Sequence, residues 1–277
     1  MPKNPVLCLH GAFLSGALFT PLKTALAKDR AASFDVYHPT LLGHGDNVTV
    51  YLDYAKQASW LGRRYAADKP VILGHSMGAG IALQCALLWP TPPRGLILCG
   101  AGLGVPTGPN TTAGFLARGI TPALTDEFVT QMTTGWFQDR QHPAIVRLCA
   151  EILALLPHQF DMIRHLSAIG IDDPKKMLRH LAVPALIVHG RHDKNRSRTE
   201  SAALVRLLGG DFVEFDSCGH MIPLEDPAAF AKTVSAWCGT AIPQTDGAGL
   251  RAACRHDRFG DSITHYFLSG RVPGYFW

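Results

Sequence analysis

Short apolar segments recur along the chain, and stretches rich in helix-forming residues separate most of them. Brief segments dominated by Val, Ile and Leu are typical of strands that are buried on both faces. The predicted strands lie at 5–9, 34–38, 70–73, 95–99, 184–189 and 212–215. The predicted helices lie at about 17–28, 52–67, 79–89, 199–208 and 227–238. This alternation predicts an α/β fold with a mostly parallel sheet flanked by helices.

The alternation stops between about residues 105 and 180, where the pattern predicts helices only. An insertion that follows a strand would lie over the carboxyl edge of the sheet, where ligands bind in such folds, and would form a cap. We expect an α/β core formed by residues 1–104 and 181–240 and a helical cap formed by residues 105–180. Residues 241–277 are expected to form a C-terminal extension of unknown role. The extension has no Lys or Glu and no helical period.

Composition and charge exclude several classes of function. With 277 residues, 47% of them hydrophobic, the chain can bury one sizeable core. The formal net charge of +4 is mild and no basic block is present, so we expect a small-molecule substrate and no nucleic-acid partner. No signal peptide or membrane span is visible, and the seven scattered cysteines predict reduced thiols in a cytoplasmic protein. The oligomeric state cannot be predicted from these features.

The segment "VILGHSMGAG" at 71–80 contains the pattern G-x-S-x-G around Ser76. This pattern forms a nucleophile elbow only between a strand and a helix. An apolar, β-branched segment precedes it and helix-forming residues follow it, so the context is the required one. The sharp turn needs neighbours without a Cβ, which Gly74 and Gly78 provide. We therefore predict that Ser76 is a nucleophile.

A serine nucleophile needs a base and a group that orients the base. His220 follows the last predicted strand in "DFVEFDSCGH", and Asp193 follows the preceding strand in "VPALIVHGRHD". The loop after 95–99 has no carboxylate, so Asp193 has no rival there. The order Ser76, Asp193, His220 is the nucleophile–acid–base order of one known fold.

Other histidines compete for these roles. His10 and His75 flank the motifs and are expected to support turns, and His44 is expected to pack a loop. His256 and His265 lie in the extension and are weaker candidates for the base. The paired histidines of "HGRHD" have no matching cluster elsewhere, so no metal site is predicted.

Attack on a carbonyl places negative charge on its oxygen, and two backbone N–H groups must face that oxygen. Met77 follows the nucleophile at a helix N-terminus, and Ala12 follows His10-Gly11 in the first turn. These two residues are the predicted oxyanion hole. The residues predicted to bind substrate are apolar or aromatic. They lie in the cap, next to Ala12 or next to His220: Phe13, Phe115, Phe128, Met132, Trp136 and Met221.

The motifs "LHGAFLSG", "LLGHGDN", "GHSMGAG", "VPALIVHGRHD" and "CGHMIPLEDP" occur in order over about residues 5–238. In these motifs the chain resembles the α/β-hydrolase superfamily, in its compact, cap-bearing, esterase-like branch. The resemblance implies that Ser76, Asp193 and His220 form a catalytic triad, that Ala12 and Met77 form the oxyanion hole, and that no cofactor is used.

Single positions narrow the branch. Cyanohydrin-cleaving relatives carry Lys after the catalytic histidine and Thr at the glycine of His-Gly, where this chain has Met221 and Gly11. Epoxide- and halide-cleaving relatives have Asp at the nucleophile, where this chain has Ser76. Thr40 and Asn47 depart from the usual Asp before "GHG" and the usual Ser after it, and the Pro that usually follows the acid is missing from "DKNRSR". These departures leave the subfamily open.

The sequence thus predicts a serine hydrolase that cleaves a carboxylic ester, thioester or lactone of a small to medium hydrophobic substrate through an acyl-enzyme. The same triad would also serve an acyltransferase or a C–C bond hydrolase. In another class, the scaffold would serve as a non-catalytic ligand-binding protein.

Overall fold

The computed structural model describes residues 4–28, 33–49, 52–104, 106, 108–167 and 177–242. The chain divides into two compact units, 1–243 and 244–277, and all described residues belong to the first. The predicted extension at 241–277 therefore lies outside the described residues from residue 243 onward, and His256 and His265 lie outside them as well.

The described sheet has six parallel strands in the order β2-β1-β3-β4-β5-β6. Their bounds are Asn4–Leu9 (β1), Phe34–Tyr37 (β2), Val71–His75 (β3), Gly95–Cys99 (β4), Ala185–Gly190 (β5) and Asp211–Phe215 (β6). The predicted α/β fold is confirmed, and each predicted strand is present with bounds that differ by at most two residues at either end.

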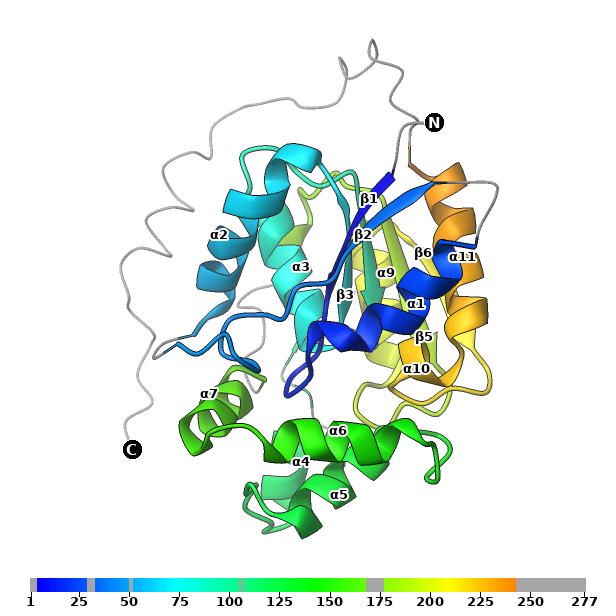
Figure 1. The fold of residues 1–277 in the computed structure, drawn as a ribbon. Coiled ribbons are helices and arrows are strands. Elements are labelled where there is room, and N and C mark those ends of the chain that lie inside the picture. The colour runs from blue at the N-terminus through cyan, green and yellow to red at the C-terminus, as the bar shows by residue number, and fades with distance from the viewer. Residues whose placement is uncertain are drawn as a thin grey trace. The chain divides into compact units, whose positions relative to one another are not determined.

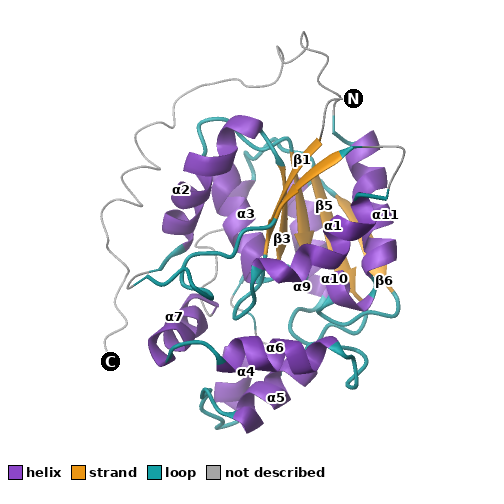
Figure 2. Ribbon diagram, in the orientation of Figure 1, coloured by secondary structure: helices purple, strands orange, loops and turns teal. Residues whose placement is uncertain are grey.

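Helices cover both faces of the sheet (Figures 1 and 2). One face packs on α1 and α11, and the other packs on α2, α3 and α9. The bounds are Thr20–Leu26 (α1), Tyr54–Tyr65 (α2), Met77–Leu88 (α3), Arg198–Leu208 (α9), Ile222–Glu225 (α10) and Pro227–Thr240 (α11), with short 3-10 helices at Gly16–Phe19 (η1) and Ala66–Asp68 (η2).

Side chains alternate between the two faces because successive residues of a strand point in opposite directions. In β1, Val6 and Cys8 belong to the core beneath α1 and α11, whereas Leu7 and Leu9 belong to the core beneath α2 and α3. Both faces are buried, so the strands are continuously apolar and were recognisable in the sequence.

Between β4 and β5 the described chain forms helices only, with the bounds Thr112–Ala117 (α4), Asp126–Thr134 (α5), Ala144–Leu153 (α6) and Pro157–Ser167 (α7). These helices lie across the carboxyl ends of the strands (Figure 1). Ser15, in the loop after β1, donates a hydrogen bond to Glu151 of α6 at 3.2 Å. Gln159 of α7 donates to the carbonyl of Gly45 at 2.9 Å. Polar contacts therefore join this helical segment to the loops at the carboxyl edge.

The order of the strands decides which loops meet. The chain passes from β1 to β2 at one edge and then returns to β3 on the other side of β1. In a parallel sheet, a ligand site forms at the point where the strand order reverses. The loops after β1 and β3, which contain Ala12 and Ser76, are therefore neighbours at the carboxyl edge.

Candidate active site

Ser76 lies on a strained turn between β3 and α3. Its backbone φ and ψ are +54° and −117°, a conformation that residues with a side chain rarely adopt. Its N–H donates to the carbonyl of Cys99 at 2.9 Å, which ties the turn to the end of β4. Serine at the start of a helix usually caps it, yet the Ser76 side chain makes no capping hydrogen bond to α3. The hydroxyl makes no hydrogen bond to any described residue, so it is available for chemistry.

Two glycines make this turn possible. A Cβ at Gly78 would lie 2.1 Å from the carbonyl oxygen of Leu9. A Cβ at Gly74 would lie 2.4 Å from the carbonyl oxygen of Gly78. Both contacts are with backbone, which cannot move aside as a flexible side chain could. The glycines of the G-x-S-x-G pattern are therefore required for helix α3 to approach β1 closely.

The structure brings Asp193 and His220 together. Asp193 Oδ2 lies 2.7 Å from His220 Nδ1, and both side chains are almost completely buried. The other carboxylate oxygen, Oδ1, accepts the backbone N–H of Asn195 at 2.7 Å and of Arg196 at 3.0 Å. Burial by itself would raise the pKa of Asp193, but the neighbouring His220 and these hydrogen bonds hold it below its usual value. Asp193 is therefore an oriented carboxylate that faces the imidazole.

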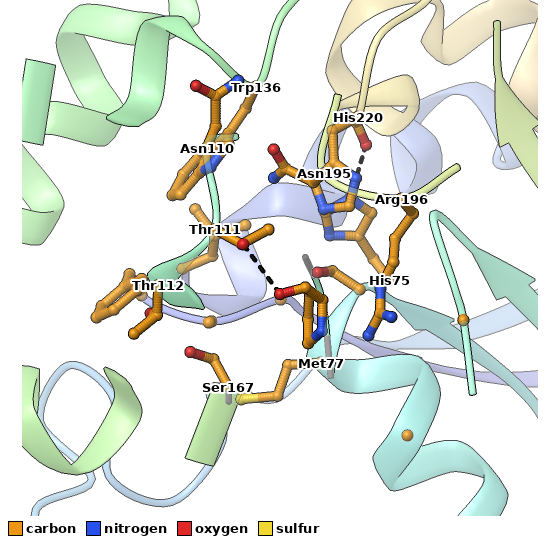
Figure 3. Close-up of a pocket in the computed structure, with 18 of the residues that line it drawn as sticks. His75, Met77, Asn110, Thr111, Thr112, Trp136, Ser167, Asn195, Arg196 and His220 are labelled. Atoms are coloured by element: carbon orange, nitrogen blue, oxygen red, sulfur yellow. Dashed lines mark hydrogen bonds between the residues drawn. The ribbon is translucent and has the colours of Figure 1, made fainter. Parts of the chain in front are cut away.

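His220 is held in place by its backbone. Its N–H donates to the carbonyl of Trp136 at 2.8 Å, and its carbonyl lies 2.9 Å from Nε2 of His75 (Figure 3). Glu225 accepts the N–H groups of Gly219 and Met221, the residues on either side, each at 3.0 Å. The same carboxylate accepts the N–H of Gln138 at 2.7 Å. Glu225 therefore fixes the turn that presents His220, a contribution that the sequence analysis missed.

The predicted oxyanion donors, Ala12 and Met77, line the same pocket as Ser76 and His220. Neither N–H takes part in the hydrogen bonds of the described loops and turns. Met77 is the first residue of α3, where N–H groups have no partner within the helix. Phe13, next to Ala12, has a φ of +65°, and its ring stacks on Phe160 of α7 at a centroid distance of 5.0 Å. That contact fixes the loop that carries Ala12.

The pocket has a cavity volume of about 70 Å³ and lies where the helical segment meets the carboxyl edge. Four of the residues predicted to bind substrate line it: Phe13, Met132, Trp136 and Met221. Phe115 and Phe128 do not line it, which corrects the prediction. Their rings pack on each other at a centroid distance of 4.7 Å inside the helical segment, and both are buried. They serve the hydrophobic core of that segment.

The histidines near the motifs have structural contacts. His10 is buried, and its Nε2 accepts the N–H of Leu41 at 2.9 Å. His44 packs edge-on against His10. Burial lowers the pKa of His44 to about 4 and the pKa of His75 to about 3, so both are neutral near pH 7. Within the described part of the chain, no three His, Cys, Asp or Glu side chains are grouped to hold a metal ion.

Six parallel strands with helices on both faces, together with Ser76, Asp193 and His220 after the carboxyl ends of β3, β5 and β6, define a hydrolase-type α/β fold. The family model described as "Alpha/beta hydrolase family" matches residues 6–233, and the chain belongs to this family. In the described ranges, no helix is both long and apolar enough to cross a membrane.

Named relatives cover most of the chain. A 2-hydroxymuconate semialdehyde hydrolase from Pseudomonas putida is 27% identical, over 83% of this chain and 85% of its own. Among solved structures, a thermophilic esterase from Thermogutta terrifontis is 23% identical with a TM-score of 0.71, over 87% of this chain and 91% of its own. A meta-cleavage product hydrolase from Pseudomonas fluorescens is 21% identical with a TM-score of 0.69, over 86% and 92%. At these identities the solved structures show the shared fold.

Proposed function

We propose that this protein is a serine hydrolase that cleaves a carboxylic ester, thioester or lactone through an acyl-enzyme. In this proposal Ser76 is the nucleophile, His220 is the general base and acid, and Asp193 orients His220. Ala12 and Met77 donate the hydrogen bonds of the oxyanion hole. The observation that carries the proposal is the unengaged Ser76 hydroxyl on a strained turn, in a pocket that is also lined by His220, whose Nδ1 lies 2.7 Å from Asp193.

The reaction follows from the positions of these groups. Because Nδ1 of His220 faces Asp193, Nε2 is the nitrogen that takes the proton from Ser76 Oγ as Oγ attacks the carbonyl. The carbonyl oxygen becomes an oxyanion, which the N–H groups of Ala12 and Met77 stabilise. The C–O bond then breaks, and the alcohol leaves with the proton from His220. Water attacks the acyl-enzyme by the same route, and the acid product leaves Ser76 free.

The shape of the pocket supports a small to medium substrate with an apolar body. The cavity is small, and Phe13, Leu14, Met132, Trp136 and Met221 form an apolar part of its wall. We propose that the helical segment acts as a cap over the active site and that Trp136 and Met132 act as its specificity residues. We also propose that the protein is cytoplasmic, because its seven scattered cysteines are typical of a protein with reduced thiols.

A panel of esters graded by acyl length, with thioesters and lactones included, tests this function. The purified protein should hydrolyse at least one member with saturation kinetics, and Ser76→Ala should reduce that rate by several orders of magnitude. An alcohol added as a second acceptor distinguishes hydrolysis from acyl transfer, because a transferase would form the new ester. Absence of turnover across the panel, with ligands still bound, would favour a non-catalytic binding protein.

A second candidate, C–C bond hydrolysis, is favoured by the similarity to 2-hydroxymuconate semialdehyde hydrolase. The same three residues would serve it, since a carbonyl is again the electrophile. The loss of the absorbance of 2-hydroxymuconate semialdehyde measures this activity directly. A kcat/KM for this compound above that for the best ester would make C–C hydrolysis the principal reaction.

A further inference from the structure

The turn that positions Asp193 also presents two polar side chains to the pocket. The N–H groups of Asn195 and Arg196 bind the Asp193 carboxylate, while the Asn195 and Arg196 side chains line the cavity. Figure 3 shows these side chains on the same side of the pocket as His220 and His75, across from Asn110 and Thr111.

Most other polar groups of the pocket are already engaged by the protein. Asn110 Nδ2 donates to the carbonyl of Gly135 at 2.8 Å. The Thr111 hydroxyl donates to the carbonyl of Gly108 and accepts the N–H of Gly114 as the cap of α4. The Ser167 hydroxyl donates to the carbonyl of Arg164. The hydroxyl hydrogens of Thr111 and Ser167 and one N–H of Asn110 are therefore already engaged.

Asn195 and Arg196 differ from them in this respect. Asn195 is 6% exposed, and its Oδ1 is buried without a hydrogen-bond partner in the described structure. Arg196 is 9% exposed, and only Nη1 of its guanidinium is engaged by described residues. The Oδ1 atom of Asn195 accepts hydrogen bonds only, so it suits a donor group of a ligand. The unengaged N–H groups of Arg196 suit an acceptor, such as the oxygens of a carboxylate.

The guanidinium of Arg196 is firmly anchored at one end. Nη1 donates to Glu200 at 2.7 Å and to the carbonyl of Gly104 at 2.8 Å. A Cβ at Gly102 would lie 2.7 Å from both Arg196 Nη1 and Glu200 Oε1, so the glycine is needed to admit this pair. The anchored arginine keeps one edge, Nε with Nη2, unengaged. That edge has the fork geometry that binds both oxygens of a carboxylate.

Glu200 does not cancel the recognition of an anion at that edge. Its second oxygen, Oε2, accepts the N–H and hydroxyl of Ser197 in the capping box of α9. Its negative charge is therefore stabilised by the N-terminus of that helix independently of Arg196. Tyr54 also lines the pocket, and its ring packs against Gly80 of α3. Burial raises the pKa of Tyr54 to about 12, although Arg196 acts to lower it, so the phenol remains a hydrogen-bond donor.

We propose that Arg196, with the Tyr54 hydroxyl as a second donor, binds a carboxylate at the end of the substrate away from the bond that is cleaved. The proposal rests on the proposed ester hydrolysis and makes its substrate class more specific: a hemiester of a small dicarboxylic acid, with an apolar segment between the ester and the free carboxylate. Arg196 is then the specificity-determining residue for the anionic end.

Binding to a variant that cannot turn over keeps this test independent of the proposed reaction. In the Ser76→Ala background, calorimetry compares the monomethyl esters of succinate, glutarate and adipate with the corresponding dimethyl esters, which lack the charge. One chain length should bind about ten-fold or more tightly as the monoester than as the diester. Adding Arg196→Gln should bring that ratio close to one, and Arg196→Lys should restore part of it, because Lys keeps the charge without the fork.

Arg198→Gln is the matched control. It also removes one positive charge, but Arg198 is exposed and pairs with Glu214 outside the pocket. The preference for the monoester should persist in this variant. Equal binding of monoester and diester at every chain length would overturn the proposal, as would an unchanged preference after Arg196→Gln or no binding of any of these esters. Failure of ester hydrolysis in the wild type, with the preference intact, would instead count against the proposed function alone.

Discussion

Oδ2 of Asp193 lies 2.7 Å from Nδ1 of His220, both side chains are buried, and His220 lines the pocket that contains Ser76. The two residues come from loops after neighbouring strands, β5 and β6. The contact fixes which imidazole nitrogen carries a proton and leaves the other for Ser76, the proposed nucleophile. The role of Asp193 can be tested by a substitution that removes its charge but keeps the oxygen that accepts the backbone N–H groups.

Asp193→Asn should reduce kcat by a factor on the order of 10⁴, because an amide favours the wrong tautomer of the imidazole. The amide still has an oxygen to accept the N–H groups of Asn195 and Arg196, so the fold should be retained. Steady-state kinetics give the rate, and a circular dichroism spectrum like that of the wild type provides the control. A loss of less than about ten-fold would show that Asp193 does not orient the base.

Gly78→Ala should destabilise the protein by about 1–3 kcal/mol or more, because its Cβ would lie 2.1 Å from the carbonyl of Leu9. Gly239→Ala is the matched control in another helix, α11. No atom lies within 4 Å of a Cβ at Gly239, so alanine there should add about 0.5–1 kcal/mol of stability. Urea unfolding measures the free energy of unfolding of both variants and of the wild type. Equal stability of the two variants would mean that the elbow tolerates a side chain.

The stability should fall below pH 6.5 because of buried neutral histidines. Burial lowers the pKa of His44 from 6.5 to about 4. Between these values the unfolded chain binds a proton that the folded chain does not, so the free energy of unfolding decreases as the pH falls. From pH 6.5 to 5, this amounts to about 2 kcal/mol for His44. His75, with a pKa of about 3, adds to the effect in the same direction.

His44→Asn should therefore lose less stability than the wild type between pH 7 and pH 5, by about 2 kcal/mol, as measured by urea unfolding at the two pH values. Between pH 7 and pH 8, where the imidazoles are mostly neutral in both states, the two proteins should change stability nearly in parallel. If the free energies of unfolding of His44→Asn and the wild type stay parallel down to pH 5, His44 binds its proton in the folded state as readily as in the unfolded chain.

Trp136→Leu should change the preference among acyl lengths, because Trp136 lines the pocket. Phe128→Leu is the comparison, since Phe128 is equally buried, at 6% exposed, but packs inside the helical segment. It should reduce stability and leave the order of kcat/KM for acetate, butyrate and hexanoate esters unchanged. If both variants change the order alike, the segment acts on specificity through its overall packing.

The contrast between Trp136 and Phe128 also shows where prediction from sequence ends. The strands, the elbow and the pair of Asp193 with His220 could be predicted because each depends on a local pattern and on the order of strands. The direction in which a side chain of the helical segment points depends on how separate helices pack. The sequence does not distinguish Phe115, which packs inside the segment, from Trp136, which lines the pocket. Glu225 and Arg196 were missed as well. Each has one partner in a distant loop, Gln138 for Glu225 and Gly104 for Arg196, that only the folded chain brings near.

The central claim is that Ser76 is an activated nucleophile. The most direct measurement is mass spectrometry of the protein after reaction with a fluorophosphonate, which labels activated serines. We expect one adduct on Ser76, in the peptide that contains "GHSMG", and no adduct in Ser76→Ala or, at the same exposure, in His220→Ala. An active enzyme with its adduct on another residue, or a Ser76→Ala variant that keeps its rate, would contradict the account.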